Sequence, residues 1–302
     1  MNSFLNISLL IICYKPKDED VTKIKRNCTL FSSGIIVWNS QKRFSLDNPN
    51  FSEIQMDHNV GQATALNIGF KKASSMNINL LLTLDQDSEL FRNEKQILEK
   101  INNVTNICIN PGGFFFPSLV SKPSFELNNS KYLEDPIEYL TPITSGCCYI
   151  LPVWKDCGGF KDDLFIEGVD TEYSLRLRRY GYKFYKFNFP IIVHDAGELI
   201  YRKLIFFSFK IRRHSDIRIF LQYRNNLPLF CKYFLYHPKW ASTSIFNVLT
   251  KKIILSLLGS KNIFRTLTYI IKGILVGILS LFIDDNYFSK PEVLLNRLNK
   301  IN

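Results

Sequence analysis

Short apolar runs alternate with helix-like patterns in the N-terminal two thirds of the chain. Four runs predict β-strands, because each is short, apolar and ended by polar residues. These strands cover 8–14, 34–38, 51–56 and 79–84. Helical spacing predicts helices over 20–28 and 62–75, each between two of the strands. Strands that alternate with helices indicate an α/β fold, with a mostly parallel, doubly wound sheet flanked by helices.

The pattern is less regular after residue 110. Residues 111–139 are rich in Pro, Gly, Asn and Ser, which predicts mostly loop with a strand or two. A strand, a short helix, a longer helix and an extended segment are then expected over 144–151, 154–160, 170–180 and 182–193. Beyond residue 198 the pattern becomes helical. We therefore expect a catalytic α/β domain over 1–197 and a helical, membrane-associated region over 198–302.

The predicted helical region is strongly basic. The whole chain has a formal net charge of +11, and between Tyr201 and Leu275 fourteen Lys or Arg stand against one acid, Asp216. A basic and apolar segment is typical of proteins that bind an anionic membrane surface. Nucleic acid also attracts basic patches, but no recognition-helix, zinc-finger or RNA-binding signature is present, so we expect no nucleic acid partner.

Residues 263–283 are the candidate for direct membrane contact. They are apolar but contain Arg265 and Lys272, whereas a spanning helix needs about 20 mostly uncharged residues. The sequence leaves open whether this segment spans the membrane or lies on it, and favours the second. The apolar run at 7–14 lacks the flanks of a signal peptide, and the seven cysteines form no paired motif. We therefore expect reduced, buried thiols and a cytoplasmic location at the inner membrane face.

Two carboxylates, Asp85 and Asp87, follow the fourth predicted strand without a break. Ligands of doubly wound sheets bind beyond the carboxyl ends of the strands. In an extended chain both side chains would point to the same side, about 6–7 Å apart. Such a pair can hold Mg²⁺ or Mn²⁺ against a diphosphate. The alternative is a helix N-cap or a surface turn.

A second acidic cluster lies at the start of the helix predicted over 170–180. Asp170 and Glu172 occupy its first turn, where the helix dipole favours anions. Arg176 follows Glu172 at the i,i+4 spacing of a helical ion pair. We expect Glu172 and Arg176 to be structural and Asp170 to face a cleft as a general base. Glu167, three residues earlier, is the alternative base.

Two segments resemble family 2 glycosyltransferases. Leu84-Asp85-Gln86-Asp87-Ser88 is similar to the metal-binding signature of that family, in the form of its bacterial rhamnosyltransferase branch. Residues 59–69 resemble the N-x-G-x-A-x-A-x-N-x-G segment of the same family. The resemblance covers residues 7–226 and implies a GT-A-type fold that binds a nucleotide sugar.

The resemblance also implies roles for individual residues. It makes Asp170 the catalytic base and His194 a third metal or diphosphate ligand beside Asp85 and Asp87. The residues expected at the nucleotide sugar are Tyr14, Asn39, Gly61, Asn67 and Gln86. Those expected at the acceptor cleft are Ser145, Gly146 and Glu167. Arg218 and Arg224 would bind the diphosphate or a lipid, or else form the solvated face of a basic helix.

One position departs from the family pattern. Relatives carry an Asp after the second strand that meets the nucleotide base, whereas this chain has Trp38. An indole cannot accept a hydrogen bond from the base, so Asn39 or a backbone carbonyl near Tyr14 would have to replace it. The identity of the donor base and sugar therefore stays open.

The resemblance implies an inverting, metal-dependent transfer of a sugar. The favoured donor is dTDP-rhamnose, and the favoured acceptor is a glycan or lipid-linked glycan in cell-surface polysaccharide synthesis, such as that of O-antigen. The alternatives are a galactofuranosyl- or hexosyltransferase of the same fold, and an inactive homologue that binds sugar or membrane. A nucleotidyltransferase is disfavoured, because residues 14–17 lack the glycines of its phosphate loop.

Overall fold

The computed structural model describes residues 4–41, 44–119, 136–194, 199–204, 207–212 and 214–282. The chain divides into two compact units. The first comprises Met1–Lys161 and Asp170–Asp195, and the second comprises Asp162–Val169 and Ala196–Asn302. The second unit thus includes a short earlier segment, 162–169, which the sequence analysis placed in the first domain.

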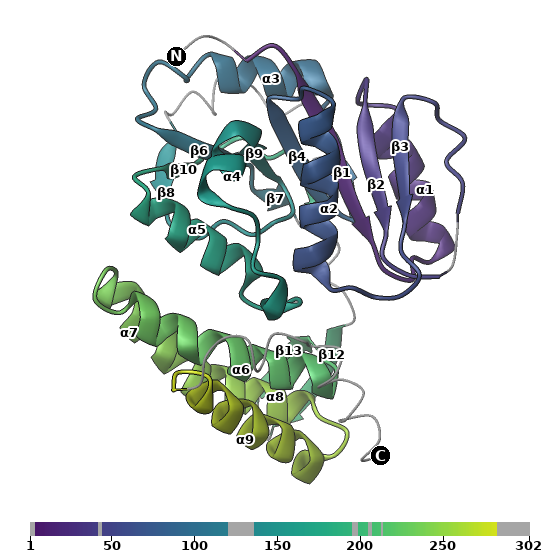
Figure 1. Ribbon diagram of the computed structural model, residues 1–302. Helices are drawn as coiled ribbons and strands as arrows, with labels where there is room; N and C mark the ends of the chain where they lie inside the picture. The colour runs from purple at the N-terminus through teal and green to yellow at the C-terminus, as the bar shows by residue number, and fades with distance from the viewer. Residues whose placement is uncertain are drawn as a thin grey trace. The chain divides into compact units, whose positions relative to one another are not determined.

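A mixed sheet forms the centre of the first unit (Figure 1). Among the described residues its strand order is β3-β2-β1-β4-β9-β6-β10-β8. The strands are β1 (Ile7–Cys13), β2 (Gly34–Trp38), β3 (Phe51–Gln55), β4 (Leu80–Asp85), β6 (Pro111–Phe115), β8 (Ile137–Tyr139), β9 (Cys147–Ile150) and β10 (Lys183–Lys186). Neighbours from β3 to β4 pair in parallel, as do β6 and β10, whereas β9 and β8 pair antiparallel to their neighbours. The predicted α/β class with a mainly parallel sheet is confirmed.

Helices flank this sheet. They are α1 (Asp18–Cys28), α2 (Gln62–Ser75), α3 (Glu94–Asn102), α4 (Leu151–Cys157) and α5 (Val169–Arg179). Figure 1 shows α1 and α2 on opposite faces, as right-handed crossovers in opposite directions along a sheet require. The close packing of α2 depends on Gly69, where a Cβ would lie 2.5 Å from the buried Leu10 side chain. The helix predicted over 62–75 is present with those bounds.

The second unit begins with a β-hairpin that the sequence reasoning missed. Strands β12 (Leu199–Leu204) and β13 (Phe207–Arg212) pair antiparallel, so the prediction of helix from residue 198 onward is wrong for this stretch. The alternation in Phe-Ser-Phe-Lys-Ile-Arg has the period of a strand. The basic and apolar composition of the region favoured a membrane-associated helix in the prediction. Helices follow: α6 (Asp216–Tyr233), α7 (Pro238–Asn247), the π-helical η3 (Val248–Lys252), α8 (Ile253–Gly259) and α9 (Ile263–Leu279).

The segment best suited to cross a membrane differs from the predicted one. Within the described residues, one continuous helical stretch, Pro238–Gly259, is long and apolar enough by length and composition, with 17% of its apolar window buried. Helix α9 ends at Leu279 and has 17 residues, and the last residue of the predicted 263–283 segment lies outside the described part of the chain.

Candidate active site

The sheet of the first unit reverses its strand order beside β1. From β1 the chain continues to β2 and β3 on one side, and it returns to place β4 on the other side. In sheets of this kind, ligands bind at such a reversal, beyond the carboxyl ends of the two central strands. Tyr14 follows β1 at this edge and Asp85 ends β4. The backbone N–H of Tyr14 donates a 2.6 Å hydrogen bond to Oε1 of Gln86, which joins the two strand ends.

The acid pair lies on a tight turn at this edge. Strand β4 ends at Asp85, residues 86 and 87 form the turn, and β5 (Ser88–Leu90) begins directly afterwards. The prediction that both carboxylates project from an extended chain is therefore wrong, because the chain turns after Asp85. Both acidic residues are partly exposed.

Gln86 holds the turn in place. Besides accepting the hydrogen bond from Tyr14, it donates through Nε2 to Oδ2 of Asp20, at 3.3 Å. Asp20 is buried at the start of α1 and also accepts from the backbone N–H of Lys17, at 2.8 Å. Sequence reasoning expected Gln86 at the nucleotide sugar and did not identify Asp20, whose role comes from a contact with a residue 66 positions away.

The backbone pairing brings His194 alongside the acid pair. Strand β11 (Ile192–His194) pairs antiparallel with β5, and His194 lies opposite Ser88, the residue after Asp87. The side chain of His194 lies outside the described residues. The backbone register is thus compatible with the predicted third ligand.

Asp85 and Asp87 suit a hard divalent cation in their chemistry. Among the residues that the structure describes, no group of three or more His, Cys, Asp or Glu side chains could hold a metal ion. Carboxylate oxygens are nevertheless the ligands that Mg²⁺ and Mn²⁺ prefer, and Mg²⁺ usually keeps several water ligands. Two partly exposed carboxylates at a strand end fit that kind of site.

The Ser145-Gly146 turn packs against the end of β4. Oγ of Ser145 accepts a 3.2 Å hydrogen bond from the backbone N–H of Asp85 and lies 2.9 Å from Oγ of Ser88. Gly146 has φ +82°, and a Cβ there would lie 2.6 Å from the carbonyl oxygen of Phe116. The structure therefore brings these two predicted cleft residues to the acid pair, and only glycine fits the second position without strain.

Asp170 lies in the first turn of α5 and is partly exposed. Its Oδ1 accepts a 2.8 Å hydrogen bond from the backbone N–H of Thr171. Burial raises the pKa of the Cys147 thiol well above its usual value, and the negative charge of Asp170 raises it further. Cys147 lies opposite Thr83, two residues before Asp85.

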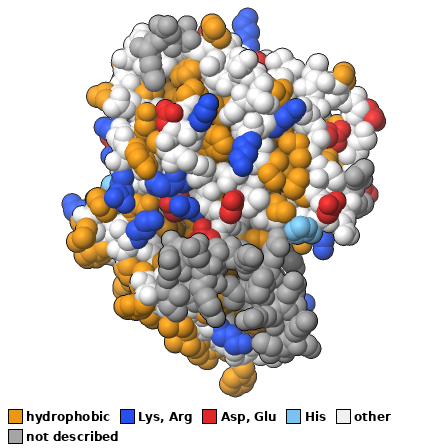
Figure 2. Space-filling view, viewed as in Figure 1, with side chains coloured by type: hydrophobic (Ala, Val, Ile, Leu, Met, Phe, Trp, Pro, Cys, Tyr) orange, Lys and Arg blue, Asp and Glu red, His pale blue; other side chains and the backbone are white. Residues whose placement is uncertain are grey.

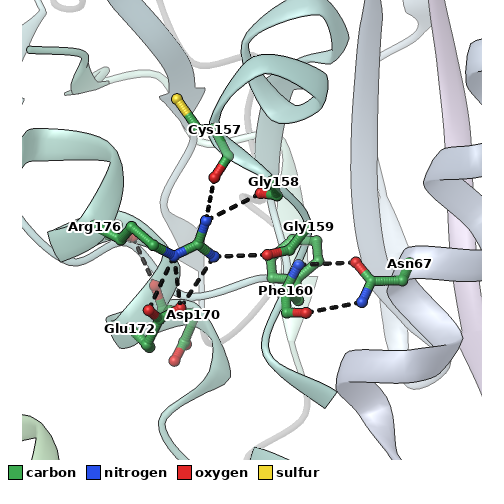
Figure 3. A network of polar contacts seen from close by, with 9 residues as sticks. Asn67, Cys157, Gly158, Gly159, Phe160, Asp170, Glu172 and Arg176 are labelled. Atoms are coloured by element: carbon green, nitrogen blue, oxygen red, sulfur yellow. Dashed lines mark hydrogen bonds and ion pairs between the residues drawn. The ribbon is translucent and has the colours of Figure 1, made fainter. Parts of the chain in front are cut away.

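Arg176 and Glu172 form the predicted ion pair, with Nε and Oε1 2.9 Å apart (Figure 3). The same guanidinium donates to the carbonyl oxygens of Cys157, Gly158 and Gly159. It therefore ties α5 to the loop that follows α4. The structural role predicted for this pair is confirmed.

Two asparagines that were predicted to bind the donor hold loops. Asn67 donates to the carbonyl oxygen of Phe160 and accepts from its backbone N–H, both at 2.8 Å (Figure 3). Asn39 is buried; its amide donates to Oδ1 of Asn59 and to the carbonyl oxygen of Gly61, and accepts from the N–H of Val60. Both amides thus fix the chain around α2, and their expected role at the nucleotide sugar stays a prediction.

Gly61 and Trp38 have structural roles at this edge of the sheet. Gly61 precedes α2 with φ +87°, a conformation that glycine adopts without strain. Trp38 is 1% exposed, and its Nε1 donates a 2.7 Å hydrogen bond to Oε2 of Glu53. The indole is therefore part of the core, where it cannot meet a nucleotide base.

The remaining predicted residues lie in the second unit. Nε of Arg218 lies 2.5 Å from Oε1 of Glu167. Arg224 is 5% exposed and donates to the carbonyl oxygen of Asp163, and burial lowers its pKa. Both arginines bind the segment 162–169, and their expected role at a diphosphate or a lipid stays a prediction.

Asn225 strengthens this attachment through contacts that the sequence did not indicate. Its Nδ2 donates to the carbonyl oxygens of Leu164 and Glu167, both at 2.7 Å. The signal in the sequence is a run of polar residues, Arg-Asn-Asn, in the middle of the helix. Buried polar side chains of this kind need partners, and the segment 162–169 provides them.

Comparisons with known proteins agree with this architecture. No protein-family model matches the chain. The dTDP-rhamnosyl transferase RfbF of Shigella flexneri is 26% identical over 246 residues, which cover 74% of this chain and 79% of that protein. The crystal structure of S. aureus TarS 1–349 in complex with UDP-GlcNAc matches with a TM-score of 0.53 and 12% identity, over 89% of this chain and 79% of that one.

Two other solved structures match over a smaller share of their length. A longer TarS structure has a TM-score of 0.46 and 13% identity, and the match covers 64% of this chain and 37% of that one. GalNAc-T7 with UDP, GalNAc and Mn²⁺ has a TM-score of 0.47 and 15% identity, with 64% and 44% covered. The chain thus spans less than half of these two proteins. The predicted resemblance to family 2 glycosyltransferases, with a GT-A fold and similarity to the rhamnosyltransferase branch, is confirmed.

Proposed function

We propose that this protein is an inverting glycosyltransferase that moves a sugar from a nucleotide-diphosphate donor to an acceptor hydroxyl. The observation that carries the proposal is the position of Asp85 and Asp87 at the edge where the strand order reverses. Asp170 lies in the first turn of α5 and is partly exposed. Sugar transfer requires a donor site and a base, and these are the roles that we propose for the acid pair and for Asp170.

The favoured donor is dTDP-rhamnose. This choice is supported by the similarity to a protein named as a dTDP-rhamnosyl transferase, which extends over most of both chains. A galactofuranosyl- or hexosyltransferase is the alternative, because the TarS structure was solved with UDP-GlcNAc and the buried Trp38 leaves base recognition to other groups.

Each residue at the edge has a distinct task in the proposed reaction. Asp85 and Asp87, with His194, would hold a Mg²⁺ or Mn²⁺ ion, which when bound neutralises the charge of the leaving diphosphate. Asp170 accepts the proton of the acceptor hydroxyl as the new bond forms. The acceptor oxygen attacks the anomeric carbon from the face opposite the diphosphate, which inverts the configuration. Ser145 and Gly146 fix the end of β4 under the reacting groups.

The proposed acceptor is a glycan, favoured in lipid-linked form, at the cytoplasmic face of a membrane. Exposed apolar side chains on the helices of the second unit support this location, among them Phe246 and Ile254, which are 67% and 56% exposed. The excess of basic residues in the same region would attract anionic lipids. Synthesis of a cell-surface polysaccharide such as O-antigen is the corresponding role.

The direct test is donor cleavage across a panel of nucleotide sugars, measured by mass spectrometry with Mn²⁺ or Mg²⁺ present. We expect the wild-type protein to cleave dTDP-rhamnose and Asp170→Asn to lose this activity. Asp156→Asn, which removes an exposed acid from α4, should retain it. If the wild-type protein cleaves no donor in the panel, with or without glycan acceptors, the chain is a binding homologue and the proposal fails.

A further inference from the structure

The second unit contains a cavity of about 650 Å³ that no part of the proposed reaction uses. Its walls come from the starts of α6 and α9, from the end of α8 and from β13. Its lining includes the basic residues Lys252, Lys261, Arg265 and His214, against one carboxylate, that of Asp216. The hydroxyl-bearing residues Ser256 and Thr266 contribute further hydrogen-bonding groups. This combination is suited to an anion.

Helices α6 and α9 start at the same end of the unit. Nε of Arg265 lies 2.7 Å from Oδ2 of Asp216, which joins their first turns. Farther along, Cβ atoms at Gly273 and Gly277 would lie 2.6 Å from the carbonyl oxygen of Phe220 and 3.0 Å from that of Arg224. The helices therefore run parallel and in close contact. Both positive dipole ends adjoin the cavity, and they add to the attraction that its basic side chains exert on an anion.

Helix α9 carries an exposed apolar stripe on the face opposite to Thr266 and Tyr269, which line the cavity. Residues spaced three or four apart share one helix face, and the stripe follows that spacing. Its members are Phe264, Leu267, Ile271, Leu275, Ile278 and, just after the helix, Phe282, which are 84%, 39%, 48%, 55%, 44% and 81% exposed. The buried residues of α9, such as Tyr269 and Ile270, lie on the opposite face. Figure 2 shows apolar side chains gathered along the edge formed by α7 and α9.

We propose that this cavity binds the phosphate headgroup of an anionic membrane lipid, with the α9 stripe in the adjoining acyl region. A phosphate accepts hydrogen bonds from basic side chains and hydroxyl groups, and an apolar stripe with basic flanks is typical of a helix that lies in a membrane interface. Nucleic acid would satisfy the cations but leave the stripe exposed to water. The inference rests on the proposed membrane location of the second unit and gives that location a defined site.

The test is sedimentation of the full chain with vesicles of phosphatidylcholine alone or with phosphatidylglycerol. We expect binding to the anionic vesicles, and a loss of affinity of at least about tenfold in Lys252→Glu/Lys261→Glu. The matched control is Lys232→Glu/Lys239→Glu, which reverses two charges of the same unit outside the cavity and should lose clearly less. Phe264→Ser should also weaken binding, and circular dichroism verifies that each variant is folded.

Several outcomes would overturn the proposal. An equal loss in both double variants would mean that diffuse charge, not the cavity, binds the surface. Calorimetric binding of inorganic phosphate without vesicle binding would assign the cavity to a free anion. Donor cleavage in solution separates this inference from the proposed function. The Lys252→Glu/Lys261→Glu variant should still cleave the donor. If the wild-type protein binds vesicles but cleaves no donor, the proposed transferase function fails and the lipid site stands.

Discussion

The guanidinium of Arg176 and the carboxylate of Glu172 form an ion pair that is almost fully buried, with side-chain exposures of 14% and 2%. Arg176 also donates to three consecutive carbonyl oxygens in the loop after α4. Asn67 holds the next residue of that loop, Phe160, from α2. Helix α5, whose first turn contains Asp170, is thereby fixed to the core of the first unit, so the proposed base has a defined position.

Replacement of Arg176 by Ala should reduce the free energy of unfolding by about 3–5 kcal/mol, because it leaves the buried carboxylate of Glu172 without its counter-ion. Urea unfolding monitored by circular dichroism measures this loss. Arg179→Ala removes an exposed arginine from the same helix and should cost less than about 1 kcal/mol. Equal losses in the two variants would show that the buried ion pair adds no more to the free energy of unfolding than an exposed arginine does.

Asp170→Asn should lower the rate of sugar transfer by about 10²- to 10⁴-fold while leaving donor binding intact, because the amide cannot accept the acceptor proton. The effect belongs on kcat, and steady-state kinetics separate it from KM. Glu167→Gln tests the alternative base. The carboxylate of Glu167 is 16% exposed and paired with Arg218, so its loss should change kcat by less than about tenfold. A reversed order of the two effects would move the base to Glu167.

Removal of divalent cations should abolish transfer, and Mn²⁺ should restore it at least as well as Mg²⁺ if the imidazole of His194 is a ligand. Asp87→Ala should weaken Mn²⁺ binding, which electron paramagnetic resonance of the free ion measures without any reaction. The control is Asp47→Ala, in an exposed loop turn stabilised by Ser45. Transfer that continues undiminished in excess EDTA would exclude the metal site from the reaction.

The local parts of the fold could be predicted from the sequence. The strand at 34–38 and the helix at 62–75 have the predicted bounds. An apolar run marks the strand and a preceding glycine marks the start of the helix, and both signals lie in the local sequence. The Glu172 and Arg176 pair was also predictable, since i,i+4 spacing alone brings the two side chains together.

Contacts between distant parts of the chain could not be predicted. Asn67 meets Phe160 across 93 positions, and Glu167 meets Arg218 across 51. Periodicity carries no information about such pairs. The resemblance therefore assigned Asn67, Glu167 and Arg218 to ligands. The hairpin of β12 and β13 was missed for a different reason, because its charge and apolar content suggested a helix on a membrane and outweighed the strand-like alternation.

Gly146→Ala should destabilise the protein more than Gly181→Ala, although both glycines have positive φ, of +82° and +85°. At Gly181 an added Cβ meets nothing within 4 Å, so only backbone strain of about 1–2 kcal/mol is expected. At Gly146 the same atom would lie 2.6 Å from the carbonyl oxygen of Phe116, and the Ser145 turn must move. The thermal midpoints of the two variants compare these costs, and a lower midpoint for Gly181→Ala would contradict the geometry.

Stability should fall as the pH rises above about 8.5, the ordinary pKa of a cysteine thiol. Burial and, to a smaller extent, the charge of Glu53 raise the pKa of Cys28 to about 12. Burial likewise raises the pKa values of Cys13 and Cys148. In the unfolded chain these thiols ionise near their ordinary pKa, whereas in the folded chain they keep their protons. Their contribution to stability is therefore complete below about pH 8.5 and is lost progressively toward pH 12.

Urea unfolding at several pH values between 7.5 and 10.5 measures this dependence. Each thiol that ionises only in the unfolded chain contributes a slope of about 1.4 kcal/mol per pH unit. Cys28→Ala should therefore show a shallower slope than the wild-type protein by about that amount above pH 9.5, whatever its stability at neutral pH. Cys231 is exposed, so Cys231→Ala should leave the slope unchanged. A slope that is the same in Cys28→Ala and in the wild type would mean that the Cys28 thiol ionises equally in both states, which its burial forbids.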